Sequence, residues 1–415
     1  MSEVSKKAKL FGILVALYSF FLYVGTASFY GVYAYVPDYV GVSLVTFGTA
    51  NSVTSIVTAL LSFVAAKIIS KYGARAMMLF GSSLAVISAI LLGLFPSSPT
   101  LFLVFAIAGF VGALAGFGCI TDACIKIFGD KSPSWIAFAI GAATVGMGVG
   151  QGLATLIMTN AGMKWVFLGL NLVSGIIALI FAIITRVPRA EAVSGSDNAT
   201  QSASAGAVDA KSTVKKSSIF KNPAAWCMFI ATFLLAIPAT LALSYATAYF
   251  PSFGKISVPI AGLMVSIMGL ATGFYNMVSG KVMTKMGMKP YAIMIVISMI
   301  ATCALALLYG SVPQVFVIVL FVLAYMLSGT LMYLPSILSP SLFGLERATE
   351  VVTTGVGFMW AGNILAPVVV AWMVSNLGFS LAYSVAIGVA ALILVCYISM
   401  FAFVKKQQVT QGEQG

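Results

Sequence analysis

Long apolar segments recur along the whole chain, and short polar segments separate them. A helix of about 20 apolar residues crosses the roughly 30 Å of hydrocarbon in a bilayer. Because backbone groups in lipid must be satisfied within their own segment, each apolar segment indicates an α-helix. The pattern predicts twelve transmembrane helices, at residues 10–34, 45–69, 76–95, 101–127, 134–159, 164–186, 224–250, 258–283, 290–310, 313–338, 348–375 and 378–403.

The composition also indicates a membrane protein. Hydrophobic residues make up 61% of the 415 residues and charged residues only 8%, whereas soluble domains carry roughly 25% charged residues. The net charge of +12 is compatible with nucleic-acid binding, but the charges lie in short loops between apolar segments. We therefore expect an integral, all-α membrane protein whose partner is the lipid bilayer and that binds no nucleic acid.

Basic residues are distributed unevenly between the two ends of the predicted helices. The amino-terminal tail, the loops that follow even-numbered helices and the carboxyl-terminal tail hold 20 of the 22 lysines and arginines, and the opposite side holds only Lys164 and Lys255. Lysine and arginine favour the cytoplasmic side of a membrane. We therefore expect both termini in the cytoplasm, and we expect the membrane to be a bacterial inner membrane.

The predicted helices fall into two related sets of six. Residues 187–222 are rich in Ser, Ala and charge, which is typical of a flexible linker. Three motifs recur at offsets of 214 or 215 residues: AYVP at 34–37 and AYFP at 248–251, AKIISKYGAR at 66–75 and GKVMTKMGMK at 280–289, and IFGDK at 127–131 and LFGLE at 342–346. The repetition indicates a duplication and predicts two pseudo-symmetric halves, 1–186 and 223–415, joined by the linker 187–222.

The loop that precedes the third predicted helix, together with its repeat, resembles a conserved loop of the major facilitator superfamily, which reads roughly G-x-L-a-D-R-x-G-R-K. The glycines Gly73 and Gly287 and the basic positions match, whereas Ser70 and Thr284 stand where the family has an aspartate. The resemblance implies a transporter whose halves rock about a central site near the bilayer midplane.

Within the superfamily, the FGDK loop followed by a glycine-rich helix resembles the oxalate–formate antiporter and monocarboxylate transporter group. Its members typically carry an arginine on the eighth helix, four residues before a glycine, and Asn276 occupies that position before Gly280 here. The oxalate–formate type also uses a lysine on the eleventh helix, and residues 348–375 contain none. The resemblance implies an organic anion as substrate, and the missing cations argue against a dicarboxylate.

Glycines concentrate in the fifth predicted helix. Small residues at four-residue spacing let two helix backbones approach closely, and the resemblance implies that these glycines contact the other half. The glycines are Gly141, Gly146, Gly148, Gly150 and Gly152.

Polar residues form stripes on several predicted helices. Tyr23, Thr26, Tyr30 and Tyr33 are spaced three or four residues apart, which places them on one face of the first helix. We interpret this face as cavity lining, although hydrogen bonding between helices would also explain such stripes. The same interpretation makes substrate-binding candidates of five residues on later helices, namely Gln151, Asn276, Tyr325, Tyr333 and Trp360.

Three charged residues are candidates for gating or coupling. Asp122 lies inside the fourth predicted helix, and Lys126 follows one turn later, so an ion pair within the helix is geometrically available. A structural pair and a role in gating or proton coupling both remain open, because charges inside a bilayer are costly and are often functional. Glu350 near the start of the eleventh helix suits a helix amino end and has a structural or gating role.

The remaining chemistry excludes several classes of protein. The chain has no histidine, and its five cysteines lie in apolar segments, so we expect no metal site, no cofactor and no enzymatic activity. We expect a monomeric secondary transporter that moves a small solute, most simply a monocarboxylate, by alternating access, as an exchanger or a facilitator. A neutral or largely apolar organic solute is the alternative, and a transporter-like sensor without transport is a third class.

Overall fold

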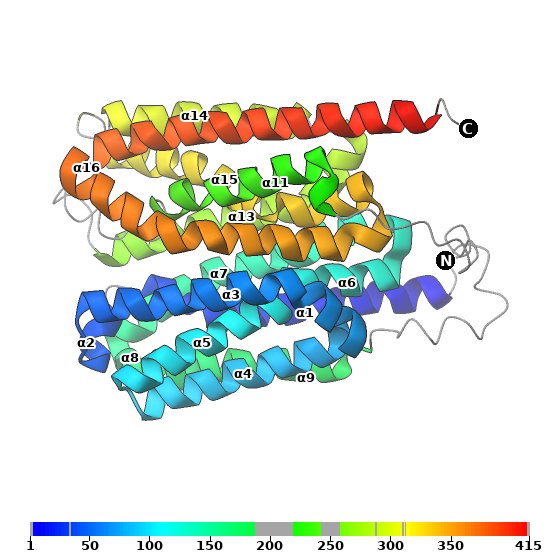
Figure 1. Cartoon of the computed structure of the whole chain (residues 1–415). Helices are drawn as coiled ribbons and strands as arrows, with labels where there is room; N and C mark the ends of the chain where they lie inside the picture. The colour runs from blue at the N-terminus through cyan, green and yellow to red at the C-terminus, as the bar shows by residue number, and fades with distance from the viewer. Residues whose placement is uncertain are drawn as a thin grey trace.

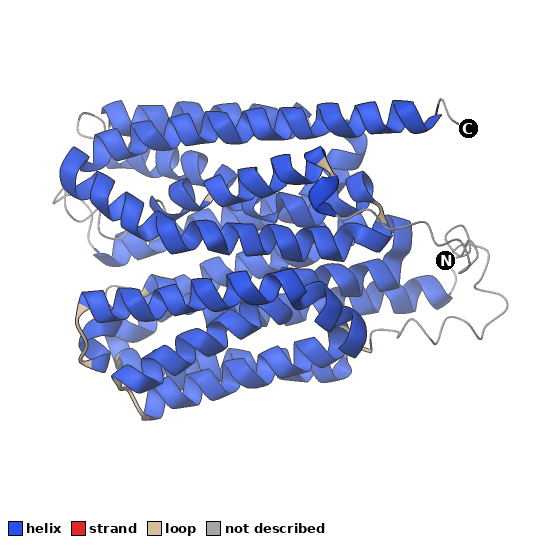
Figure 2. Cartoon of the chain, viewed as in Figure 1, coloured by secondary structure: helices blue, strands red, loops and turns tan. Residues whose placement is uncertain are grey.

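The structure is a computed structural model of the full chain, and it describes residues 3–32, 35–186, 219–241, 258–286, 289–308, 311 and 313–412. These residues form helices joined by short turns, and the described part of the chain contains no strand, as Figure 2 shows. The predicted all-α class is therefore confirmed. Predicted residue Tyr33 lies outside the described residues.

The first bundle contains the helices that precede residue 186. They are α1 (Glu3–Gly31), α2 (Val36–Val40), α3 (Leu44–Tyr72), α4 (Ala74–Leu94), α5 (Ser98–Leu114), α6 (Phe117–Phe128), the short turn η2 (Gly129–Lys131), α7 (Ser132–Ala161), α8 (Met163–Trp165), the π-helical segment η3 (Val166–Asn171) and α9 (Leu172–Ile184). The predicted fourth helix is thus two helices, α5 and α6, which meet at a bend.

The second bundle contains the helices that follow the predicted linker. They are the turn η5 (Ile219–Lys221), α11 (Pro223–Leu234) with its helical continuation at 236–241, α13 (Val258–Met286), α14 (Lys289–Leu308), α15 (Gln314–Phe343) and α16 (Leu345–Gly412). A bend at Gly378, with φ of 76°, divides α16 into the eleventh and twelfth predicted helices. Most of the predicted linker lies outside the described residues, so its boundaries stay a prediction.

Local chemistry explains where several helices begin and end. The hydroxyl of Ser43 accepts a hydrogen bond from the backbone N–H of Thr46, and Asn222 accepts one from Ala224. Such caps satisfy backbone donors that have no partner in the first turn of a helix. Gly73 ends α3 with φ of 85°, a conformation that glycine adopts without the steric cost of a side chain.

In the described part of the chain, nine helices are long and apolar enough to cross a membrane, judged by length and composition. The helices α14, α15 and the part of α16 before Gly378 occupy the other three predicted spans. Large apolar side chains such as Leu60, Ile300 and Val315 are more than 60% exposed on the outside of the bundles. Such a surface suits lipid and not water.

The two bundles lie side by side along their length, as Figure 1 shows, with α1–α9 below and α11–α16 above in that view. Their closest contact is between α7 and α13, where glycines bring the backbones together. A Cβ built on Gly148 would lie 2.8 Å from the carbonyl oxygen of Ser266, and one on Gly273 would lie 2.6 Å from the backbone nitrogen of Val145. The expected contact of the glycine-rich helix with the other half is therefore present.

A second contact joins α16 to α3 and α6. The methyl group of Thr353 lies against Gly118, and Gly357 faces Ser62 and Phe63. Thr353 is about two turns into α16, at the end of the molecule where α1 also begins, as Figure 1 shows. The two bundles are therefore in contact at the end of the molecule where α1 and α16 begin.

Candidate functional site

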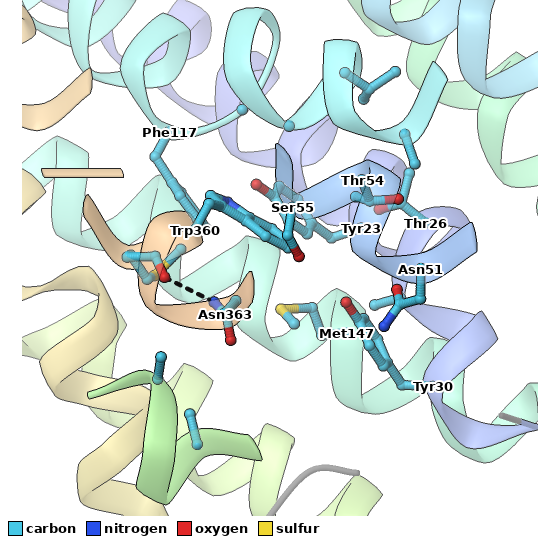
Figure 3. A pocket seen from close by; sticks show the side chains of 18 of the residues that line it. Tyr23, Thr26, Tyr30, Asn51, Thr54, Ser55, Phe117, Met147, Trp360 and Asn363 are labelled. Carbon is cyan, nitrogen blue, oxygen red and sulfur yellow. Dashed lines mark hydrogen bonds between the residues drawn. The ribbon is translucent and has the colours of Figure 1, made fainter. Parts of the chain in front are cut away.

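A cavity of about 180 Å³ lies between the two bundles. The first bundle contributes its walls from α1, α3, α5, α6 and α7, and the second contributes α11 with its continuation and α16. Figure 3 shows side chains from both bundles pointing into this space. The cavity therefore has the position that a site shared by two moving halves requires.

The described walls of the cavity carry no Asp, Glu, Lys or Arg. They present alkyl groups, aromatic rings, hydroxyls and amides, so a ligand meets dipoles and no formal charge. A cavity without fixed charge accepts neutral solutes readily, and it holds an ion only through oriented hydrogen-bond donors.

The polar face of α1 lines the cavity. The ring of Tyr23 stacks on that of Phe117, with centroids 5.4 Å apart. The hydroxyl of Thr26 donates to the backbone oxygen of Leu22 at 3.0 Å, so its proton stays within the helix. Tyr30 lines the same cavity, and its hydroxyl makes no hydrogen bond within the described part of the chain.

The second bundle provides Trp360 and Asn363, one turn apart on α16 (Figure 3). The amide nitrogen of Asn363 donates to the backbone oxygen of Met359 at 3.1 Å, which orients its side-chain oxygen as an acceptor. The indole N–H of Trp360 has no acceptor among the described residues. Donors without a hydrogen-bond partner among the described residues thus face the cavity from both bundles, Tyr30 and Ser55 from the first and Trp360 and Thr240 from the second.

Sequence reasoning missed three polar residues of α3 that line the cavity. Asn51 and Ser55 are spaced four residues apart, and Thr54 lies between them, so they form a polar stripe like that of α1. The hydroxyl of Thr54 donates to the backbone oxygen of Phe105 at 2.8 Å, which ties α3 to α5. The spacing was a usable signal for Asn51 and Ser55.

Two predicted binding residues lie outside the described lining. Gln151 is buried at 2% exposure on α7, where its backbone packs against Gly31. Asn276 is completely buried on the face of α13 that carries Gly273, and both polar atoms of its side chain lack a hydrogen-bond partner in the described chain. Their roles in substrate binding stay predictions. The side chains of Tyr325 and Tyr333, on α15, lie outside the described residues.

The predicted charge pair on α6 is present. Lys126 Nζ lies 2.8 Å from Asp122 Oδ2, and the two side chains are 25% and 11% exposed. Glu350 is exposed, near the start of α16. These positions agree with an ion pair inside one helix, and the gating and coupling roles of all three residues stay predictions.

The described residues contain no group of three or more His, Cys, Asp or Glu side chains that are close enough to hold a metal ion. All five cysteines are free thiols, and Cys119 donates to the backbone oxygen of Ala74 at 3.1 Å. The cysteines therefore act as small packing residues.

The fold and the shared cavity define a helical membrane protein of the transporter type, and comparison with known proteins identifies the family. Residues 15–293, more than half of the chain, match the sequence model of the Major Facilitator Superfamily. The chain belongs to this superfamily, whose members are transporters of small solutes and not enzymes.

Two individual proteins are similar to the chain. The oxalate:formate antiporter of Oxalobacter formigenes is 24% identical over 253 residues, which cover 60% of this chain and 57% of that protein. The structure of the proton:xylose symporter XylE, bound to 6-bromo-6-deoxy-D-glucose, matches with a TM-score of 0.73 over 96% of each chain, at 16% identity. The second likeness concerns the fold alone.

Proposed function

We propose that the protein is a secondary transporter that moves a small monocarboxylate across the membrane by alternating access. The observation that carries this proposal is that unpartnered donors, Tyr30 and Trp360 among them, face one uncharged cavity from opposite bundles. A carboxylate bound between them would accept a hydrogen bond from each half. Such a ligand binds more tightly to the conformation in which both halves contact it than to conformations in which only one half does. A ligand shifts a conformational equilibrium only through such a difference in affinity.

Because the cavity offers neutral donors and its described walls have no cation, it favours a solute of low charge. A singly charged carboxylate spreads its charge over two oxygens, and two neutral donors satisfy part of its lost hydration. A dianion such as oxalate loses far more hydration and meets no lysine or arginine on the described walls. The partial similarity to the oxalate:formate antiporter therefore supports an organic anion, with the smaller charge preferred.

A neutral organic solute is the second candidate. The same uncharged walls support it, because a neutral ligand carries no charge that would have to lose its hydration on entering the cavity. The two candidates differ in how much they depend on the donors. Hydrogen bonds to a charged group are worth about 1.5–3 kcal/mol, and those between neutral groups about half as much.

Substitutions that remove one donor and leave an aromatic ring at its position test the proposal. Trp360→Phe and Tyr30→Phe should each weaken acetate binding by about 10- to 100-fold, because each removes a hydrogen bond to a charge. Titration calorimetry on the purified protein, with acetate, oxalate and acetamide, measures the effect. Phe358→Leu, which changes a neighbouring ring outside the described cavity lining, is the control.

The titrations separate the two candidates. Acetate binding that is stronger than both oxalate and acetamide binding, and that falls in both donor variants, agrees with the proposal. Unchanged acetate affinity in both variants contradicts it. Acetamide binding that exceeds acetate binding supports the neutral solute instead.

A further inference from the structure

A second cavity of about 110 Å³ opens beside the central one, inside the first bundle. Helices α1, α3, α4, α5 and α9 and the segment η3 form its walls. We call it the side pocket. Seven residues line both cavities, among them Leu22, Thr26, Tyr30 and Thr54. Because the two spaces share these walls, they lie next to each other.

Most of the side pocket is apolar and aromatic. Phe29 and Phe105 meet edge to face with ring centroids 5.1 Å apart, and Leu92 and Phe167 complete this wall. Phe105, Leu92 and Phe167 are at most 6% exposed and belong to one packed cluster. Packed rings of this kind form a preformed surface that gains from covering apolar ligand atoms.

The side pocket also holds two polar groups with unused capacity. The buried hydroxyl of Ser88 has no hydrogen-bond partner within the described residues. The side-chain oxygen of Asn171 lies 2.6 Å from the hydroxyl of Ser28, and its amide makes no other hydrogen bond within the described residues. A buried polar group without a hydrogen-bond partner is unfavourable, so a ligand that pairs with Ser88 recovers part of that cost.

Asn171 and Phe167 both belong to η3, the π-helical segment at residues 166–171. A π-helical turn is rare and is often found at functional sites, because it turns side chains away from the ordinary helical register. Here it directs one ring and one amide toward the same pocket. The irregular segment is thus an independent sign that this wall serves a ligand.

None of the described residues of the side pocket carries a charge. We propose that the side pocket binds an uncharged, mainly apolar branch of the transported solute, while its polar head stays at Tyr30 and Trp360. This inference rests on the proposed function, and it narrows the substrate class to monocarboxylates with an apolar or aromatic side group. Ser88, Ala89, Phe167 and Asn171 then determine the specificity of transport.

The test compares ligands that differ only by a ring. Titration of the purified full chain with acetate and phenylacetate should give at least about tenfold tighter binding of phenylacetate, since the ring covers apolar surface. Ala89→Leu and Ser88→Leu fill the side pocket from α4. Each should reduce phenylacetate affinity to that of acetate and leave acetate affinity unchanged.

The control variant is Ile87→Phe, which adds bulk on the same helix at a side chain that is 45% exposed on the outer surface. It should change neither affinity. The variant at Ser88 also removes an unpartnered hydroxyl, so it guards against a folding defect in the variant at the tightly packed Ala89. Phenylacetate preference that is missing in the native protein, or that survives in both filling variants, overturns the inference. Loss of acetate binding in both folded variants overturns it as well.

Titration with acetamide and phenylacetamide separates this inference from the proposed function. If neither carboxylate binds but phenylacetamide binds more tightly than acetamide, and the filling variants remove that difference, the side pocket stands and the anion proposal fails. If a co-purifying lipid disappears from the filling variants while phenylacetate preference remains, the occupant is a lipid chain and the inference fails.

Discussion

At the scale of single residues, Tyr30 and Asn276 differ in their surroundings although both were predicted to bind the substrate. Both are polar residues on transmembrane helices, but Tyr30 faces a cavity and Asn276 is enclosed between helices. The spacing of polar residues along α1 was sufficient to predict that Tyr23, Thr26 and Tyr30 share a face. The orientation of Asn276 depends on how α13 packs on α7, which its own sequence does not reveal.

Asn276 gives a prediction for stability. Because both polar atoms of its side chain are buried without partners in the described chain, Asn276→Leu should stabilise the protein by about 1–3 kcal/mol. The thermal unfolding midpoint in detergent measures this, with Ser279→Ala as a control, since Ser279 already donates to the backbone oxygen of Asn276. A lower midpoint for Asn276→Leu would contradict the account. An unchanged KM for uptake would remove Asn276 from the predicted substrate-binding residues.

The pair Asp122 and Lys126 gives a second prediction. Asp122→Asn leaves the lysine charge without its partner at 2.8 Å, so it should lower stability, and Asp122→Asn with Lys126→Met should restore much of the loss. Thermal unfolding of the single and double variants measures the coupling. Uptake with and without a pH gradient, in the same variants, tests the coupling role. Gradient-driven uptake that Asp122→Asn abolishes would contradict a purely structural pair.

At the scale of elements, the glycines of α7 determine how closely the bundles approach. Gly148 faces α13, whereas Gly146 and Gly150 face α1, where built Cβ atoms would overlap the backbone oxygens of Phe20 and Val24. One helix thus packs tightly on both its own bundle and the other. The glycine-rich helix and its contact with the other half were predicted from the sequence. Which glycines face α13 and which face α1 became clear only from the packing of the helices in the structure.

The packing of α7 on α13 gives a third prediction. Gly148→Ala should reduce stability by about 1–3 kcal/mol and slow transport, because its Cβ would lie 2.8 Å from the backbone of α13, which cannot move as a side chain can. Gly48→Ala on α3 is the control, since its Cβ would have no neighbour within 4 Å. Thermal unfolding and uptake rates compare the two. Equal unfolding midpoints and uptake rates for the two variants would contradict the prediction, because they would show that α7 and α13 can move apart without loss of stability or transport.

The loop after α3 carries the family motif without its aspartate. The hydroxyl of Ser70, which stands at that position, donates to the backbone oxygen of Lys67 in the same helix, and the guanidinium of Arg75 donates to the backbone oxygen of Ile183 at 2.8 Å. The bond from Arg75 ties this end of α4 to α9 of the same bundle. The altered motif was readable from the sequence, whereas the partner of Arg75, 108 residues away, was not.

At the scale of the whole molecule, two bundles enclose a chamber whose described walls bear dipoles and no formal charge. The length of the apolar segments was sufficient to predict most of the helices, since lipid forces helical backbone on every crossing, although the predicted fourth helix is divided into α5 and α6. The cavity was predicted only in part: the spacing of Asn51 and Ser55 was a signal in the sequence, whereas the contribution of Phe117 depends on how α6 packs against the other helices. The division into 1–186, 187–222 and 223–415, and the cytoplasmic position of both ends, remain proposals.

The most direct test is acetate exchange in proteoliposomes that contain the purified protein. Labelled acetate should enter vesicles preloaded with unlabelled acetate, and external acetate should compete at concentrations at which oxalate does not. Trp360→Phe should raise the KM for exchange by about 10- to 100-fold. Oxalate exchange that equals or exceeds acetate exchange would contradict the claim that the cavity prefers a singly charged anion. A KM that Trp360→Phe leaves unchanged would contradict the claim that neutral hydrogen-bond donors bind this anion.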